Sequence, residues 1–212
     1  MSNNSVSHLI KIGKKEHVIE LYEKGLIYMN NIECFRKYED QELKLRGDKD
    51  EGITGLEQVT SITLLSPEGE KLAHGNSAQL KFHSSENNGN IYSLIAITSD
   101  DSMANLHLDE RNKQLGDYFV VIHDFKEFIK RMEHKLKESH LEYKFGVVNY
   151  YDPKKYRGRL DVFCKPMYFE YQKEYRIFVK REETDAFKIE IGSIEDISRC
   201  FDIENLNKLG SY

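Results

Sequence analysis

The chain has 212 residues, of which 39% are hydrophobic and 32% charged, a balance that indicates a polar protein able to bury one large core. Its formal net charge of −5 argues against non-specific binding to duplex nucleic acid, which needs a basic surface to displace counterions. Three cysteines without a CxxC pair fit a reducing compartment and argue against a structural zinc site. No apolar run has the length of a membrane span or a leader, so we expect a cytoplasmic protein without membrane contact.

The first half of the sequence alternates short strands with short helices. Gly25 follows the apolar positions of the first helix and predicts its end. The segment 46–52 carries several charges and a glycine near each end, and it predicts a surface loop or lid. The expected strands are 8–12, 26–29, 57–65, 79–83 and 91–98, and the expected helices are 16–24, 34–45 and 103–115.

The second half begins with a buried type of strand at 118–122. Asp124 then predicts the start of the best helix of the chain, because Glu127 follows it three residues later as in a capping box. The apolar residues of this helix have helical spacing and indicate a core face: Phe125, Phe128, Ile129, Met132 and Leu136. Further strands are expected at 143–150, 169–179 and 187–191, and the last two are expected to pair as a terminal hairpin.

These elements contain more strands than helices, and the helices are interspersed early and in the middle of the chain. The order predicts a single α+β domain over 1–212, with a mainly antiparallel sheet, open to being split, and a few flanking helices. Neither the GxGxxG nor the GxxxxGK[ST] nucleotide-binding pattern occurs in a fitting place.

The strand expected at 169–179 has an unusual polar face. Alternation places Glu170, Gln172, Glu174 and Arg176 on one side of a strand that is otherwise mostly aromatic and β-branched. Such a face is costly to bury unless its charges serve each other or a ligand. The alternative is a solvated face on which Glu174 and Arg176 pair in water.

The pair Gln172 and Glu174 resembles the Gln-x-Glu of mono-ADP-ribosyltransferases, which stands at the entry of a late strand. In that family the glutamate binds a hydroxyl of the nicotinamide ribose and stabilises the positive charge that develops as nicotinamide leaves. The glutamine orients the acceptor group. The resemblance therefore implies Glu174 and Gln172 as catalytic residues and a split antiparallel sheet.

The same resemblance implies NAD⁺ as the cofactor and places residues that grip it on the first strands. His8 and Lys11, followed by Tyr28, stand in the order that a histidine, tyrosine, glutamate class of this fold would use. Our candidates for cofactor binding are Lys11, Tyr28, Arg36 and Arg176, and Arg176 has the second option of holding Glu174 ionised. The activity implied is a mono-ADP-ribosyltransferase or an NAD⁺ glycohydrolase.

A second resemblance covers most of the chain but depends on few residues. The segments 21–28, 35–39 and 169–177 are similar in order to those of an uncharacterised bacterial family found beside phage-defence genes. This outline implies a bacterial or phage conflict effector, with an unknown acceptor (protein or nucleic acid) and an inhibitory partner protein as an option.

Two other functions stay open at this point. Glu39, Asp40, Asp48, Asp50 and Glu51 offer enough carboxylates for a Mg²⁺-dependent nuclease, although acids in such loops are more often simply solvated. The ADP-ribosyltransferase hypothesis, in contrast, assigns no metal ligands. The non-enzymatic alternative is a protein-interaction module that binds its partner through the loop 46–52.

Overall fold

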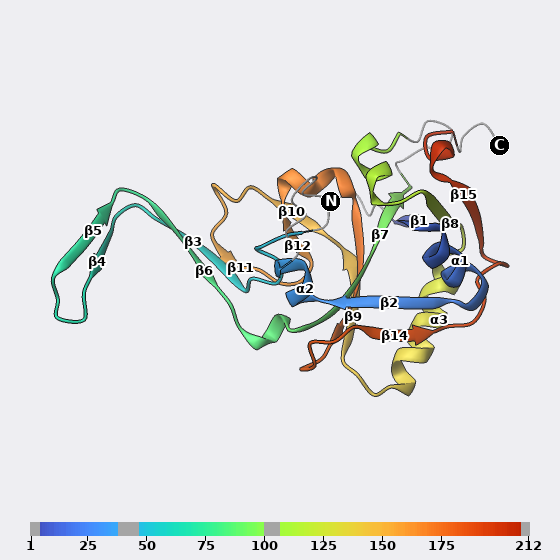
Figure 1. The fold of residues 1–212 in the computed structure, drawn as a ribbon, viewed down its shortest axis with the longest axis horizontal. Coiled ribbons are helices and arrows are strands. Elements are labelled where there is room, and N and C mark those ends of the chain that lie inside the picture. The colour runs from blue at the N-terminus through green and yellow to red at the C-terminus, as the bar shows by residue number, and fades with distance from the viewer. Residues whose placement is uncertain (1–4, 38–46, 100–106, 209–212) are drawn as a thin grey trace.

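The computed structural model describes residues 5–37, 47–99 and 107–208, and it has an α+β fold with mainly antiparallel sheets (Figure 1). The main sheet has eight strands: β1 (Val6–Gly13), β2 (Leu26–Asn31), β7 (Gly89–Thr98), β8 (Tyr118–Ile122), β9 (Tyr143–Val147), β13 (Glu174–Lys180), β14 (Phe187–Glu190) and β15 (Ser198–Asp202). The helices are α1 (Lys15–Lys24), α2 (Ile32–Lys37) and α3 (Phe125–Glu138), with short 3₁₀ turns η1 (Ser85–Asn87), η3 (Glu110–Leu115), η4 (Met167–Gln172) and η5 (Ile203–Asn205).

Strand β7 is the centre of the main sheet and the place where it divides. On one side β7 pairs along most of its length with β13, which in turn pairs with β9. On the other side it pairs with β2 only at Asn90 and Ile91, and with β1 only from Ile95 onward. Residues 92–94 of β7 therefore have no strand partner there. We call this opening between β1 and β2 the fork.

Helix α1 joins the two strands that diverge at the fork. It ends at Gly25, which has φ 66° and donates its backbone N–H to the carbonyls of the last turn, as the sequence predicted. The helix packs Val18 and Leu21 into the main core. The chain from β1 through α1 to β2 thus forms the outer wall of the fork.

The two faces of the main sheet have separate cores. On one face α3 packs Phe128, Met132 and Leu136 against alternate residues of the sheet. The Asp124 side chain accepts a hydrogen bond from the Glu127 backbone N–H at 3.0 Å, so the predicted N-cap of this helix is confirmed. On the other face, apolar residues of β1, β7 and β8 pack with Leu108 and Leu206.

A long hairpin arm projects from the body, at the left of Figure 1. Its base pairs β3 (Gly55–Val59) with β6 (Ala78–Phe82), and its tip pairs β4 (Ile62–Leu65) with β5 (Lys71–Gly75). The base also pairs with β11 (Gly158–Arg159), and a separate parallel pair is formed by β10 (Asn149–Tyr151) and β12 (Cys164–Pro166). The tip exposes three large apolar side chains: Leu64, Leu65 and Leu72.

The structure corrects several of the predicted elements. The strand expected at 169–179 begins only at Glu174, because residues 167–172 form η4 and Lys173 turns the chain with φ 42°. Strand β14 pairs with β2 and not with β13. The strand expected at 57–65 is divided into β3 and β4. The helix expected at 34–45 is observed as α2 up to Lys37, and 38–46 lie outside the described residues.

The segment expected as a helix at 103–115 is a 3₁₀ turn over its last residues, and 100–106 lie outside the described part of the chain. None of the described helices is long and apolar enough to cross a membrane.

Candidate functional site

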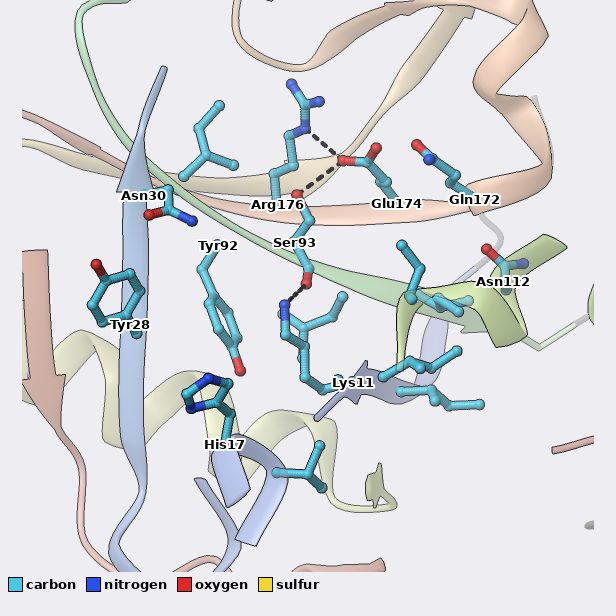
Figure 2. Close-up of a pocket in the computed structure, with 18 of the residues that line it drawn as sticks. Lys11, His17, Tyr28, Asn30, Tyr92, Ser93, Asn112, Gln172, Glu174 and Arg176 are labelled. Carbon is cyan, nitrogen blue, oxygen red and sulfur yellow. Dashed lines mark hydrogen bonds and ion pairs between the residues drawn. The ribbon is translucent and has the colours of Figure 1, made fainter. Parts of the chain in front are cut away.

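A cavity of about 640 Å³ opens at the fork, and we call it the fork cavity. Its lining comes from segments that are far apart in the sequence: β1, α1, β2, α2, Glu51, β7, η3, β12, η4 and β13. Lys11, Tyr28, Gln172, Glu174 and Arg176 all line it (Figure 2). The structure thus brings five of the six residues proposed from the sequence to one cavity.

Lys11 binds the part of β7 that has no strand partner on the fork side. Its Nζ donates a hydrogen bond to the carbonyl oxygen of Ser93 at 2.8 Å and lies 4.2 Å from the centre of the Tyr92 ring. A buried backbone carbonyl without a partner is costly, so the ammonium stabilises the open edge of β7 at the fork. Lys11 also gives this part of the cavity wall a positive charge.

Glu174 is 6% exposed and makes three hydrogen bonds through its carboxylate. One oxygen, Oε2, accepts from the Ser93 hydroxyl at 2.9 Å and from Arg176 Nε at 2.8 Å. The other oxygen, Oε1, accepts from the Lys165 ammonium. Because a carboxylate offers about four acceptor positions, these contacts leave one on Oε1 for a ligand.

The surroundings of Glu174 keep its carboxylate ionised. Burial by itself raises the pKa of a carboxyl, but the charges and hydrogen bonds of Arg176 and Lys165 outweigh it and hold the pKa of Glu174 well below its usual range. The backbone N–H of Glu174 donates to the Tyr150 hydroxyl at 2.9 Å, which fixes the start of β13. The result is a preorganised negative charge at the cavity wall.

Arg176 is held on all sides by the protein. Its guanidinium forms a two-point ion pair with Glu51, at 2.7 and 2.9 Å, and donates to the carbonyl oxygen of Val162 at 2.5 Å. With Nε bound to Glu174, four of its five donors are used. Of the two roles predicted for Arg176, this geometry favours holding Glu174 over direct cofactor binding, which stays a prediction.

Lys165 and Gln172 complete the buried polar cluster. Lys165 is 7% exposed, and its Nζ donates to the amide oxygen of Gln172 at 2.7 Å as well as to Glu174. Sequence reasoning missed Lys165 because it belongs to β12, outside the strand that drew attention. It also missed Ser93 and Glu51 as partners in this cluster. A lysine inside a mostly apolar segment before Pro166 was the only available signal for it.

Tyr28 and Arg36 are placed differently. Tyr28 is 49% exposed and lines the cavity from β2, across from Glu174 (Figure 2). Arg36 is not among the described residues that line the cavity. Its guanidinium donates to the carbonyl oxygens of Glu51 and Gly52, at 2.6 and 3.3 Å, and so stabilises the segment that supplies the partner of Arg176.

The described part of the segment predicted as a surface loop or lid is largely packed into the body. Asp48 and Glu51 are 5% and 4% exposed, and Glu51 is held by Arg176. Arg46 lies outside the described residues. Burial, together with the nearby Glu51, raises the pKa of Asp48 to about 6. This correction has a physical reason, because the buried Arg176 needs a second carboxylate beside Glu174 and this segment supplies it.

Two of the acids considered for a magnesium site form ion pairs with basic side chains. Asp50 pairs with Lys81 at 2.6 Å and Glu51 pairs with Arg176, while Glu39 and Asp40 lie outside the described residues. Among the residues that the structure describes, no three His, Cys, Asp or Glu side chains form a group that could hold a metal ion.

No family model, curated protein or solved structure matches the chain significantly. The chemistry of the site therefore has to be argued from its own geometry. That geometry offers an ionised, immobile carboxylate, a nearby amide and a cationic side chain around one cavity. Such a group can stabilise positive charge that develops on a ligand bound beside it.

Proposed function

We propose that the protein is an NAD⁺-dependent enzyme that transfers ADP-ribose to an acceptor or to water at the fork cavity. The observation that carries this proposal is the convergence of Lys11, Tyr28, Gln172 and Glu174 on one cavity at the split of an antiparallel sheet. The resemblance of Gln172 and Glu174 to the Gln-x-Glu of mono-ADP-ribosyltransferases supports the same function. We place this activity in the cytoplasm of a bacterial cell, as an effector in conflict with phage.

The cavity fits a ligand of this kind in size and in charge. Its volume of about 640 Å³ falls in the range of pockets that enclose small molecules and cofactors. Lys11 and the exposed Lys14 and His17 line the same cavity and can attract a diphosphate. Apolar side chains of β1 and β7, among them Ile12 and Ile95, also line the cavity and can pack against a ring.

In this proposal Glu174 is the catalytic carboxylate. Bound NAD⁺ supplies a bond between ribose and a positively charged nicotinamide, which leaves as a neutral molecule. Glu174 stabilises the positive charge left at the ribose, and its fixed position avoids the cost of reorienting solvent. Arg176, Lys165 and Ser93 hold the carboxylate in place, so they act through Glu174.

Gln172 orients the acceptor in this proposal. Gln172 is 6% exposed and lines the cavity, and its amide is positioned by Lys165, which donates to the amide oxygen. The nature of the acceptor decides between a transferase and an NAD⁺ glycohydrolase, and both use the same carboxylate. We propose a protein or nucleic-acid acceptor, with a partner protein that inhibits the enzyme until it is needed.

The proposal is tested by thermal unfolding with NAD⁺ and with Mg²⁺. A ligand present at 100 times its Kd stabilises a protein by about 2.7 kcal/mol, which corresponds to a rise in the midpoint of roughly 5–10 °C for a chain of this size. We expect this rise with NAD⁺ and no change with Mg²⁺ or EDTA. Lys11→Met should reduce the rise, whereas the exposed Lys144→Met should not.

Stabilisation by Mg²⁺ alone would contradict the proposal. If Asp48→Asn also abolished that stabilisation, the nuclease would be the better hypothesis. No change in the thermal midpoint with either ligand would favour the third hypothesis, a non-enzymatic protein-interaction module.

A further inference from the structure

Within the described part of the chain, the side chain of Asn112 is a buried amide whose nitrogen is hydrogen-bonded and whose oxygen is not. It lies on η3, is 0% exposed and lines the fork cavity. Its Nδ2 donates to the carbonyl oxygen of Tyr171 at 3.1 Å, which fixes the orientation of the amide, because the flipped form would place two oxygens together. Its Oδ1 has no hydrogen-bond partner among the described residues.

An orphaned acceptor of this kind is rare in a folded protein and needs an explanation. Buried polar groups are nearly always hydrogen-bonded, since leaving one unpaired costs the free energy of removing it from water. The other buried side-chain N and O atoms in the described part of the chain do have partners. Asn112 is therefore a specific exception, and the exception lies at a cavity.

The surroundings of Asn112 indicate what the missing donor belongs to. Figure 2 shows Asn112 at the end of the cavity near Gln172 and Glu174. Ile12, Ile95 and Leu115 line the same cavity and form an apolar cluster together. An apolar wall next to a single acceptor suits a flat ring that carries one N–H donor.

We propose that Asn112 Oδ1 accepts a hydrogen bond from the carboxamide N–H of nicotinamide, and that it thereby selects the amide form of the dinucleotide. This inference rests on the proposed function, because the bond that breaks joins nicotinamide to the ribose beside Glu174. The ring must then lie next to Glu174, which is the end of the cavity where Asn112 is found. Asn112 is a specificity residue in this account.

The same acceptor would disfavour the acid form of the ligand. Nicotinic acid carries a carboxylate in place of the carboxamide, so it has no donor and would place a negative charge against Oδ1. A site built to bind a ligand N–H rejects an analogue without it, because the buried acceptor is left unpaired. The second N–H donor on NAD⁺ that belongs to a flat ring is the exocyclic amine of adenine, and the test separates the two.

The experiment compares dissociation constants by calorimetry for NAD⁺, nicotinic acid adenine dinucleotide and nicotinamide hypoxanthine dinucleotide, which lacks the adenine amine. We expect the wild-type protein to bind NAD⁺ and the hypoxanthine analogue about equally, and the nicotinic acid analogue roughly tenfold to a hundredfold more weakly. Free nicotinamide and nicotinic acid, which have no bond to a ribose that the enzyme could break, form a second pair. We expect nicotinamide to bind more tightly than nicotinic acid.

One variant assigns the preference to Asn112. Asn112→Leu should bring the ratio between the amide and acid forms close to one. If the leucine variant does not fold, the wild-type ratios decide. Asn207→Leu is the control. The amide of Asn207 also contacts the segment 108–110, but Asn207 does not line the cavity.

Equal binding of the amide and acid forms by the wild-type protein would overturn the inference. Weak binding of the hypoxanthine analogue alone would also overturn it, since Oδ1 would then face adenine. A clear preference for the amide without any release of nicotinamide would support the inference and count against the proposed reaction. Failure of all three dinucleotides to bind would contradict both.

Discussion

Lys11 and Ser93 meet where the main sheet divides, with the Lys11 ammonium 2.8 Å from the Ser93 carbonyl oxygen. The hydroxyl of the same serine binds Glu174 on the neighbouring strand at 2.9 Å. Ser93 thus links a cation on β1 to the carboxylate on β13 through the stretch of β7 that lacks a strand partner on the fork side. The split of the sheet creates the cavity and also places these groups around it.

We predict that Lys165→Met destabilises the protein strongly. The substitution removes one partner of a buried ion pair and leaves Glu174 Oε1 and the Gln172 amide oxygen without this donor. Breaking such a pair costs about 3–5 kcal/mol. Urea unfolding should show this loss for Lys165→Met, and a smaller one for Lys165→Arg. Lys144→Met, in an exposed side chain of β9, is the control. A loss below about 1 kcal/mol would show that the cluster is not a unit.

Asp48 predicts a dependence of stability on pH. Its pKa is raised from 3.8 to about 6 in the folded protein, so between these values the folded state binds more protons than the unfolded state. The free energy of unfolding must therefore decrease as the pH rises from about 4 to 6. The Asp48→Asn variant has no carboxyl proton to lose and should be more stable than wild type by about 3 kcal/mol at pH 7.5, with little difference at about pH 4.

Denaturant unfolding at the two pH values measures this difference. In the Asp48→Asn variant the new amide oxygen can still accept from the Asp50 backbone N–H, so the turn is expected to survive. Glu57→Gln, in an exposed side chain of β3, is the matched control. An Asp48→Asn protein that is less stable than wild type at the higher pH would contradict the prediction.

Gln172→Ala is predicted to separate the two outcomes of the proposed reaction. The amide that orients the acceptor is lost, while Glu174 keeps its bonds to Ser93, Arg176 and Lys165. Transfer of labelled ADP-ribose to an acceptor in cell extract should fall, and release of nicotinamide by hydrolysis should persist. An equal loss of both products would assign Gln172 to NAD⁺ binding or to the structure of the cluster.

The tip of the hairpin arm is predicted to be dispensable for the fork cavity. Strands β4 and β5 form a separate two-stranded sheet, and Leu64, Leu65 and Leu72 are 55–67% exposed. Deleting residues 61–77 and joining β3 to β6 by an Asn-Gly turn should leave the thermal midpoint and NAD⁺ binding nearly unchanged. A longer deletion that removes Gln58 and Gln79 should lower the thermal midpoint, because both side chains donate to the carbonyl oxygen of Pro153. Loss of NAD⁺ binding in the shorter deletion would place the tip in the site.

Local signals made the fold class and several elements predictable. The capping box at Asp124 and the stop at Gly25 depend on neighbours in the sequence, and both are observed. The prediction of a strand at 169–179 is wrong for its first residues, because the alternating aromatic residues that indicate a strand belong here to η4. The left-handed Lys173 separates η4 from β13, and its carbonyl oxygen accepts a hydrogen bond from the backbone N–H of Ala96, a tertiary contact that the local sequence does not show.

The buried cluster was beyond sequence reasoning for a different reason. The charged groups around Glu174 come from three segments, at Glu51, Lys165 and Arg176, which only the tertiary fold brings together. The alternative of a solvated face on which Glu174 and Arg176 pair in water is therefore wrong, since both side chains and the Lys165 side chain are buried. Lys11 and Tyr28 could be proposed because the resemblance supplied an order of strands, while the cavity that they share with Glu174 was visible only in the structure.

The central claim is tested most directly by the release of nicotinamide from labelled NAD⁺ by the wild-type protein and by Glu174→Gln, with and without cell extract as a source of acceptor. The substitution keeps the size of the side chain and removes its charge, and circular dichroism monitors whether the variant folds. We predict release by the wild-type protein and a rate lower by roughly two to three orders of magnitude for folded Glu174→Gln. A wild-type protein that releases no nicotinamide under either condition, or a folded Glu174→Gln that releases it at the wild-type rate, would contradict the account.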